Sequence, residues 1–217
     1  MKRLFDMAVS MIGLICTAPL MLLLAIWIKL SSPGPVLYSQ IRVGLHGQSF
    51  RLYKFRSMVV NADQLGSSVT TGRDPRITTV GRILRKTKLD ELPQLWNVLR
   101  GDMSLVGPRP DVPEIIATYT PEMRHILNIR PGITSIASLH LRHEEELLSL
   151  AADPNTFYIQ TVVPAKVNLA MEHVRRDSFL FDLFILIQTV WAVAAGRSTQ
   201  IKEHVVVTDL RQKALQM

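Results

Sequence analysis

The chain has 217 residues, of which 47% are hydrophobic and 20% charged, so it can form one or two folded domains and is not a disordered chain. Its 25 Lys and Arg residues exceed its 18 Asp and Glu residues, and the net charge of +7 favours an anionic partner such as nucleic acid, a phosphate-bearing ligand or an acidic lipid surface. The single cysteine, Cys16, excludes an internal disulfide framework, and the lack of clustered thiols disfavours a structural zinc site.

The first predicted element is an apolar helix within residues 1–32. Residues 7–28 carry no charge, and a straight helix of that length spans roughly 33 Å, against about 30 Å for a bilayer core. The apolar stretch is too long for a signal peptide, and no small-residue cleavage site follows it. The segment is therefore expected to associate with a membrane.

Two features argue against a plain membrane-spanning anchor. Pro19 lies in the middle of the apolar stretch, where it removes a helix hydrogen bond and bends the axis. Basic residues flank both ends, and the positive-inside rule places such flanks in the cytoplasm. A re-entrant helix that bends at Pro19 satisfies both facts, with Thr17 or Ser10 offering oxygens to the freed backbone groups. The pattern alone leaves the spanning and re-entrant topologies open.

After a turn at residues 31–35, the pattern predicts an α/β fold that is mostly helical with a few short strands. Strands are expected at 36–40 and 49–55, joined as a hairpin through Gly44 and Gly47. A polar loop with some helix is expected over 61–72, and a short helix with a basic face over 77–88. Apolar residues at helical spacing after residue 92 predict an amphipathic helix that ends at Gly101.

Further helices are predicted over residues 144–152, 163–176 and 179–195. The last of these is strongly apolar, with Asp182 as its one charge, and suits either a membrane interface or the protein core. The tail over 201–217 is polar apart from residues 205–207, which we expect to form one strand. That strand can pair within the chain or with a second copy in a homodimer.

The densest candidate for chemistry is the pair Asp90 and Glu91, followed closely by Pro93. Because proline fits only the first turn of a helix, both carboxylates are expected at or just before a helix N-terminus. The helix dipole favours ionised carboxylates there by about 0.3–1 kcal/mol. An ionised aspartate can attack phosphorus, and carboxylates are natural Mg²⁺ ligands. On this dipeptide alone, an acidic helix cap is the commoner explanation.

Cations surround this acidic pair in the sequence. Arg109 lies between Pro108 and Pro110, whose rings stiffen the backbone, and such an arginine suits bidentate recognition of phosphate. A surface loop explains the same pattern equally well. Lys54 and Arg56 follow a predicted strand, where a solvated strand end is the plain alternative. The basic residues just upstream of the pair are Arg82, Arg85, Lys86 and Lys88.

The run of residues 89–110 strongly resembles the core of the bacterial sugar transferases, the monotopic phosphoglycosyl transferases, in their minimal form. Residues 54–58 (KFRSM), 74–78 (DPRIT) and 130–134 (RPGIT) are similar to that family too, and the likeness covers roughly residues 1–200. Two positions depart from the family pattern. The helix break is Ala18-Pro19 where the family usually has Ser-Pro, and Ser135 stands where many members have glycine.

The resemblance implies a layout and a reaction. It implies a re-entrant membrane helix over 1–32, a catalytic domain with interfacial helices over 33–200 and a tail over 201–217. Family members transfer a phospho-sugar from a UDP-sugar to a polyprenol phosphate such as undecaprenyl phosphate, and UMP leaves. The implied location is the cytoplasmic face of the bacterial inner membrane, in contact with membrane lipid, where the reaction starts exopolysaccharide or other glycoconjugate synthesis.

The resemblance also implies residue roles. Asp90 would be the nucleophile that forms an aspartyl phospho-sugar intermediate, and Glu91 would bind Mg²⁺ and accept the proton of the lipid phosphate. Both carboxylates would be ligands of the Mg²⁺ cofactor. The cations that would offset phosphate charge are Lys54, Arg56, Arg85 and Arg109, of which Arg109 would help to hold the nucleotide.

The sequence also permits three other interpretations. A membrane scaffold or partner-binding subunit of the same fold, without turnover, is the alternative to an enzyme. Nucleic-acid binding is disfavoured because no known motif is present and the cations interleave with apolar runs. Residues 140–146 (HLRHEEE) do not match the spacing of zinc helix motifs, and an acidic helix start explains the glutamates. The sequence does not indicate which sugar is transferred.

Overall fold

The structure, a computed structural model, describes residues 1–66, 70, 74–141, 144–176, 178–194 and 205–216. As predicted, the fold is mostly helical with a few short strands. The helices are α1 (Lys2–Ser31), α2 (Thr79–Thr87), α3 (Gln94–Arg100), α4 (Pro113–Ala117), α5 (Ile136–His140), α6 (Glu144–Leu148), α7 (Pro154–Phe157), α8 (Val163–Arg176), α9 (Phe179–Ala194) and α10 (Val205–Gln216). The strands are β1 (Leu37–Val43), β2 (Ser49–Phe55), β3 (Ser104–Val106) and β4 (Gly132–Thr134).

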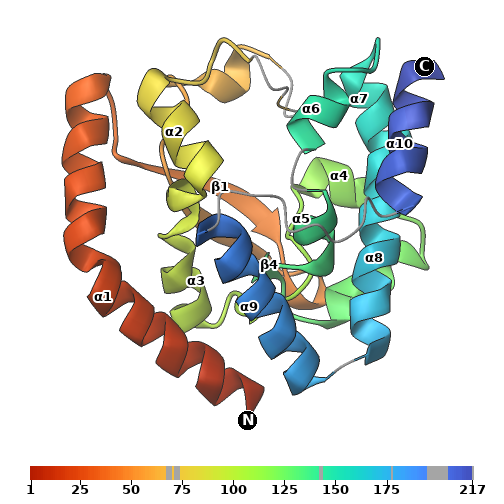
Figure 1. Cartoon of the computed structure of the whole chain (residues 1–217), viewed down its shortest axis with the longest axis horizontal. Coiled ribbons are helices and arrows are strands. Elements are labelled where there is room, and N and C mark those ends of the chain that lie inside the picture. Colours follow the sequence, from red (N-terminus) through yellow and green to blue (C-terminus); the bar gives the residue numbers. More distant parts are fainter. Residues whose placement is uncertain (67–69, 71–73, 142–143, 177, 195–204, 217) are drawn as a thin grey trace.

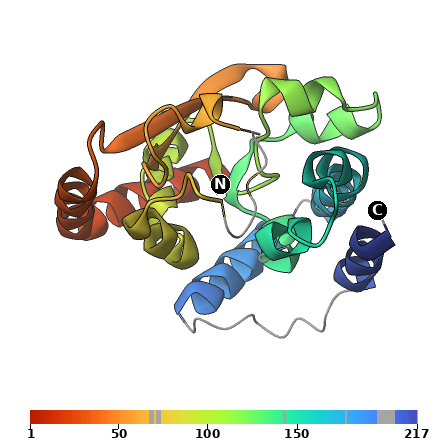
Figure 2. The ribbon, with the colours of Figure 1, turned by 90° about the horizontal axis from the view of Figure 1, so that it is seen from above.

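Helix α1 runs along one side of the molecule, with α2 and α3 next to it and α8 and α10 on the far side (Figure 1). Seen from above, the β1–β2 hairpin lies along one face and α9 along the opposite one (Figure 2). Strands β3 and β4 lie between these faces. The loop that follows β3 and the turn that precedes α3 meet where Arg109 bonds Glu91, and these two segments carry the candidate site.

Helix α1 is long and apolar enough to cross a membrane by length and composition, with a mean hydropathy of 2.4 over its best window. Only 11% of that window is buried in the protein, so most of its apolar surface faces outward. Pro19 lies inside the helix, which runs obliquely from the N-terminus and then changes direction (Figure 1). Its topology in a bilayer stays a prediction.

Thr17 and Ser10 were expected to bond the backbone groups that Pro19 frees, and the structure shows different contacts. Thr17 Oγ1 donates to the carbonyl of Gly13 at 2.7 Å, four residues earlier. The carbonyl that Pro19 leaves without its usual donor is that of Ile15, because a helical N–H bonds the residue four positions back. Ser10 Oγ is buried and has no hydrogen-bond partner within the described ranges. Thr17 therefore supports the turn before the proline, where such back-bonding tends to bend helices.

The hairpin was predicted correctly. Strand β2 has the expected bounds, and β1 begins one residue later than expected and continues to Val43, which pairs with Ser49. Pairing extends this far because the tight turn between the strands is closed by a hydrogen bond from Gly44 N to Gln48 O at 2.8 Å. The parallel pair β3–β4 was not predicted, because strands of three residues are too short to show a periodic pattern.

The middle helices follow the predictions with small shifts of their ends. Helix α2 starts after Thr78, whose hydroxyl caps it by accepting from Gly81 N at 2.9 Å. Helix α3 ends at Arg100, and Gly101 caps it in the left-handed conformation with φ of 100°, as expected for the residue that stops the helix. Helix α6 ends at Leu148, four residues earlier than expected. In the polar loop over 61–72, the described helix is one turn at Ala62–Gln64, and residues 67–69 and 71–72 lie outside the described residues.

The predicted strand at 205–207 is wrong, because these residues begin helix α10. Leu210 and Ala214 of α10 are buried in the main core cluster, at 2% and 1% exposure, and Val206 and Val207 pack against it. The apolar residues therefore recur at helical spacing, a pattern that the three valines alone do not reveal. Residues 201–204 and 217 of the predicted tail lie outside the described residues.

Helices α8 and α9 have the predicted starts, and α8 also has the predicted end. Residue 195 of the second prediction lies outside the described residues. Helix α9 buries Ile185 and Ala192, and it exposes an apolar stripe at helical spacing: Leu180, Phe184, Ile187 and Trp191. The helix thus packs on the core with one face and leaves another apolar face outside.

Candidate active site

Asp90 and Glu91 lie in a single 3₁₀ turn, Leu89–Glu91, between α2 and α3. Lys88 ends α2 in the left-handed conformation, with φ of 59°, and this turns the chain toward the interior. Both carboxyl side chains are buried, in residues that are 5% and 8% exposed. As predicted, they lie just before a helix N-terminus, since α3 begins at Gln94.

Asn97 ties this region to the hairpin. Its side chain is fully buried and donates to the carbonyl of Arg51 at 2.8 Å, while it accepts from Tyr53 N at 3.1 Å. A further bond joins Asn97 Nδ2 to Asp102 at 3.1 Å. Because α3 is held on strand β2 in this way, Lys54 at the end of β2 is brought to the acidic turn.

Glu91 is the centre of a charged cluster. Its Oε1 accepts from Lys54 Nζ at 3.1 Å and from Arg109 Nη2 at 2.8 Å, and Arg109 Nη1 approaches Oε2 at 3.4 Å. Burial acts to raise the pKa of Glu91, but the charges of Arg109 and Lys54 outweigh it and hold the pKa well below its usual value. Burial lowers the pKa of Lys54 to about 8, although Glu91 opposes the shift. Glu91 is therefore ionised at neutral pH.

Asp90 differs from its neighbour. Its Oδ1 is buried and has no hydrogen-bond partner among the residues that the structure describes. Burial raises the pKa of Asp90, the charge of Glu91 adds to this rise, and Lys54 is the main opposing charge. A buried carboxylate oxygen without a donor is poorly solvated, so it can accept a ligand, a metal or a new covalent bond.

Arg109 is presented by a loop that the hairpin and β4 hold from both sides. Arg42 Nη1 donates to the carbonyl of Pro110 at 3.0 Å, and Val43 N donates to the carbonyl of Asp111 at 3.0 Å. On the other side, Gly132 N donates to the carbonyl of Pro108 at 2.9 Å. The loop is therefore anchored by three of its carbonyls, those of residues 108, 110 and 111, and its prolines stiffen it further.

Of the six residues predicted from the sequence for the site, the structure brings four together: Asp90, Glu91, Lys54 and Arg109. Arg85 pairs with Glu145 of α6, and its charge still acts on Asp90. The guanidinium of Arg56 instead donates to the carbonyls of Pro33 at 2.6 Å and Ser32 at 2.8 Å, just after α1. Arg56 therefore stabilises the junction between α1 and the hairpin, and its predicted role in substrate binding stays a prediction.

The sequence reasoning missed several charged residues around this site. One of them is Arg42. Burial lowers the pKa of Arg42, and the positive charge of the nearby Arg109 lowers it further. Lys166 of α8 donates to Tyr158 at 3.1 Å and pairs with Glu144 at 3.1 Å, and Glu144 acts in turn on Arg109. No local signal marks Lys166, which is one lysine in an amphipathic helix. Glu144 and Glu145 belong to the acidic helix start that the sequence did show.

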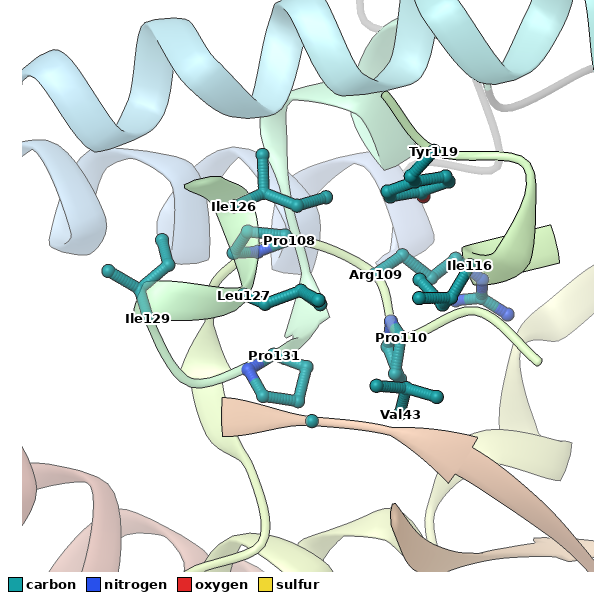
Figure 3. A pocket seen from close by; sticks show the side chains of 11 residues that line it. Val43, Pro108, Arg109, Pro110, Ile116, Tyr119, Ile126, Leu127, Ile129 and Pro131 are labelled. Carbon is teal, nitrogen blue, oxygen red and sulfur yellow. The ribbon is translucent and has the colours of Figure 1, made fainter. Parts of the chain in front are cut away.

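A small cleft lies beside the Arg109 loop. It holds about 250 Å³ of empty space, open to solvent in part, and is lined mainly by apolar side chains (Figure 3). In Figure 3 the guanidinium of Arg109 lies beside Ile116, away from the end of the cleft near Pro131. Neither Asp90 nor Glu91 lines this space. The two carboxylates therefore lie outside this cleft, although Arg109 lines it and also bonds Glu91.

Asp90 and Glu91 fit the way in which proteins usually bind Mg²⁺, and they do not fit a metal site whose ligands all come from the protein. Among the described residues, no group of three or more His, Cys, Asp or Glu side chains could hold a metal ion. Mg²⁺ is usually bound by one or two carboxylates, with water and substrate phosphates as its other ligands. The unpartnered Oδ1 of Asp90, next to Glu91, fits that pattern.

The bacterial sugar transferase family model matches residues 1–196 of this chain. The "Uncharacterized sugar transferase EpsL" of Bacillus subtilis is 36% identical over 205 residues, which cover 94% of this chain and 93% of that protein. The "UDP-N-acetylgalactosamine-undecaprenyl-phosphate N-acetylgalactosaminephosphotransferase" of Aeromonas hydrophila is 38% identical over 200 residues, which cover 90% of this chain and 44% of that protein.

The "UDP-glucose:undecaprenyl-phosphate glucose-1-phosphate transferase" of Escherichia coli is 36% identical over 199 residues, which cover 88% of this chain and 39% of that protein. The chain thus spans less than half the length of these two relatives and nearly the whole length of the Bacillus protein.

Proposed function

Because this chain belongs to the bacterial sugar transferase family, we propose that it transfers a sugar 1-phosphate from a UDP-sugar to undecaprenyl phosphate. The product is undecaprenyl diphosphate sugar, the first intermediate of an exopolysaccharide or another glycoconjugate. Two relatives support these substrate classes, since each of their names contains both a UDP-sugar and undecaprenyl phosphate. The observation that carries the proposal is the buried, unpartnered Oδ1 of Asp90 beside the Lys54–Glu91–Arg109 cluster.

In the first step, ionised Asp90 attacks the phosphorus that carries the sugar. A bond forms between a carboxylate oxygen and that phosphorus, the bond to the UMP oxygen breaks, and UMP leaves with its electron pair. Asp90 then carries the phospho-sugar as an acyl phosphate. Lys54 and Arg109, which bond the neighbouring Glu91, would offset the charge that develops on the phosphoryl oxygens.

In the second step, an oxygen of undecaprenyl phosphate attacks the same phosphorus and the bond to Asp90 breaks. The carboxylate of Asp90 is regenerated, and the lipid diphosphate sugar is released. Where the attacking phosphate carries a proton, Glu91 is the proposed acceptor, and because its low pKa makes it a weak base the proton then passes to solvent and Glu91 returns to its charged form. Splitting the transfer in two lets one small site serve the two anionic substrates in turn.

Asp90 and Glu91 would hold Mg²⁺ at this site. The ion would supply positive charge to the phosphoryl oxygens of the bound substrate. Without such screening, two unit charges 4 Å apart at an effective dielectric of 20 repel by about 4 kcal/mol.

The proposed location is the cytoplasmic face of the inner membrane. The exposed apolar residues of α1 and the stripe Leu180, Phe184, Ile187 and Trp191 of α9 support contact with lipid. A re-entrant α1 would keep the site at the headgroup plane, where the acceptor phosphate meets a donor from the cytosol. Arg85 near Asp90 would contribute to phosphate binding after release from Glu145.

The test is covalent labelling. Purified protein is incubated with Mg²⁺ and UDP-sugars labelled in the sugar, without acceptor, and the denatured protein is counted. We expect label on the wild type from at least one UDP-sugar and none on Asp90→Asn. Asp63→Asn is the matched control, because Asp63 is an exposed carboxylate that bonds Tyr38, and it should keep the label. Label that survives Asp90→Asn, or none from a panel of UDP-sugars, would contradict the covalent route.

The same variant separates the enzyme from a non-catalytic membrane scaffold. An enzyme with Asp90→Asn should not restore polysaccharide synthesis to a deletion strain, although the protein reaches the membrane in normal amounts. A scaffold predicts full complementation by that variant.

A further inference from the structure

The first turns of helix α1 carry three charged side chains that point into the protein. Arg3 Nη1 donates to the carbonyl of Val98 at 2.7 Å, and Nη2 donates to that of Leu99 at 3.1 Å. These carbonyls belong to the last turn of α3, where a helix leaves its acceptors without intrahelical partners. Arg3 therefore closes the end of the helix that begins just after Glu91.

Asp6 makes the corresponding contact with strand β3. It is 4% exposed, its Oδ2 accepts from Ser104 Oγ at 2.7 Å, and its Oδ1 accepts from Leu105 N at 3.4 Å. Lys2 Nζ donates to the carbonyl of Val106 at 3.1 Å and pairs with Asp182 of α9. A buried carboxylate is costly unless it is hydrogen-bonded, so these contacts favour one arrangement of α1 on β3.

The two segments that Arg3 and Asp6 contact, α3 and β3, are the two that carry the partners of the central ion pair. Glu91 precedes α3, whose far end Arg3 holds. Arg109 follows β3, and Asp6 holds the beginning and middle of that strand. The Glu91–Arg109 contact, at 2.8 Å, is thus the meeting point of two elements that the same helix start fastens together.

We propose that Arg3 and Asp6 are positioning residues of the active site, which set the placement of Arg109 against Glu91 through α3 and β3. The start of α1 then helps to position the active-site residues, in addition to any role of the helix in membrane attachment. This inference rests on the proposed function, because its effect is measured as transfer activity.

The test uses the full-length protein in detergent, with UMP release measured at varied concentrations of donor and of a short-chain polyprenol phosphate. Asp6→Ala should lower kcat at least tenfold and change the KM for the acceptor less than threefold. Ser10→Ala is the matched control, since Ser10 lies one turn further along α1, is fully buried and has no hydrogen-bond partner in the part of the chain that the structure describes. It should leave kcat within twofold of the wild type.

A double-mutant cycle separates positioning from general loss of structure. If Asp6 acts through Arg109, then Asp6→Ala should cost at least tenfold in the wild type but less than threefold in an Arg109→Lys background. Equal losses in both backgrounds, or an unchanged kcat in Asp6→Ala, would overturn the inference. Where Asp6→Ala does not fold, Ser104→Ala removes one of the two partners of Asp6 and takes its place, with about a threefold loss expected.

The two proposals fail in different ways. A wild type that releases no UMP from any UDP-sugar contradicts the proposed function. An active wild type whose Asp6 and Ser104 variants are equally active, with additive effects in the cycle, contradicts this inference alone.

Discussion

Two carboxylates that are adjacent in the chain, Asp90 and Glu91, have opposite environments. Glu91 has its charge balanced by Lys54 and Arg109, and its pKa is low. Asp90 has a buried oxygen without a donor, and burial raises its pKa. Pairs of titratable groups whose pKa values are pushed apart are typical of sites where one group reacts and the other stays charged. This contrast supports the assignment of Asp90 as the nucleophile.

Lys54 predicts a pH dependence. Burial lowers the pKa of Lys54 to about 8, so its positive charge is lost as the pH rises through that value. The rate of UMP release in the first step should therefore fall above about pH 8. It should also fall at low pH, because the raised pKa of Asp90 means that the nucleophile takes up a proton there.

The Lys54→Arg variant tests the upper limb, because arginine stays protonated at every pH used. With saturating donor, the fall near pH 8 should move upward by at least one pH unit, while the acidic limb stays in place. The same alkaline fall in both proteins would show that another group controls it.

Arg56 and Arg109 are predicted to have different roles. Arg56→Ala removes the bonds to Ser32 and Pro33 and leaves their carbonyls without these donors. We expect a loss of roughly 2–3 kcal/mol in the free energy of unfolding, since hydrogen bonds to charged groups are among the stronger ones. Arg109→Ala should lower the transfer rate more than Arg56→Ala does. Thermal unfolding and UMP release of both variants check this, and equal stability losses with equal activities would contradict the distinction.

At the scale of elements, the site is the meeting point of three short segments. The turn Leu89–Glu91 supplies the carboxylates, the end of β2 supplies Lys54, and the loop after β3 supplies Arg109. Each segment is held by buried hydrogen bonds to its neighbours, such as those of Asn97 with Arg51 and Tyr53. A substitution that changes the packing of α2 should therefore disturb the site and also lower the stability of the protein.

Gly81 provides that test. Its position inside α2 suggests that alanine would help by about 1 kcal/mol of helix propensity. A Cβ there would lie 1.9 Å from the carbonyl oxygen of Ser57, however, and the backbone would have to shift. We expect Gly81→Ala to lower the unfolding midpoint by several degrees, at about 2–4 °C per kcal/mol for a chain of this size.

Gly13→Ala in α1 is the matched control for Gly81→Ala. Its Cβ would meet only the end of the Leu95 side chain, at 3.2 Å, and a flexible side chain can move. Its unfolding midpoint should stay close to that of the wild type. A Gly81→Ala protein as stable as this control would show that α2 can shift without cost.

At the scale of the whole molecule, helix α1 both exposes an apolar surface and holds other parts of the protein in place. The outer surface of α1 is apolar and exposed, while Lys2, Arg3 and Asp6 at its start bind the interior. The basic residues that the positive-inside rule counts before the apolar stretch are thus used in protein contacts. The topology of α1 must therefore be measured rather than inferred from these charges.

Cysteine labelling measures it. In a Cys16→Ser background, one cysteine is added before Lys2 and another near the C-terminus, and each is treated with a membrane-impermeant maleimide in intact and in permeabilised cells. For a re-entrant α1, both cysteines should be protected in intact cells and react after permeabilisation. Reaction of the N-terminal cysteine alone in intact cells would establish a spanning helix.

The sequence by itself determined the long apolar helix, the hairpin, the amphipathic helix that ends at Gly101 and the apolar helix α9, because each shows a local pattern over many residues. It also indicated Asp90, Glu91 and Arg109 as candidates, through the acidic pair before Pro93, the two prolines around Arg109 and the resemblance of residues 89–110 to a known family. Only the tertiary structure decided that Lys54 meets Glu91, that Arg56 binds the linker after α1, that residues 205–207 are helical and that Asp6 is buried on β3. These facts depend on contacts between residues far apart in the chain, which pack together only when the whole chain folds.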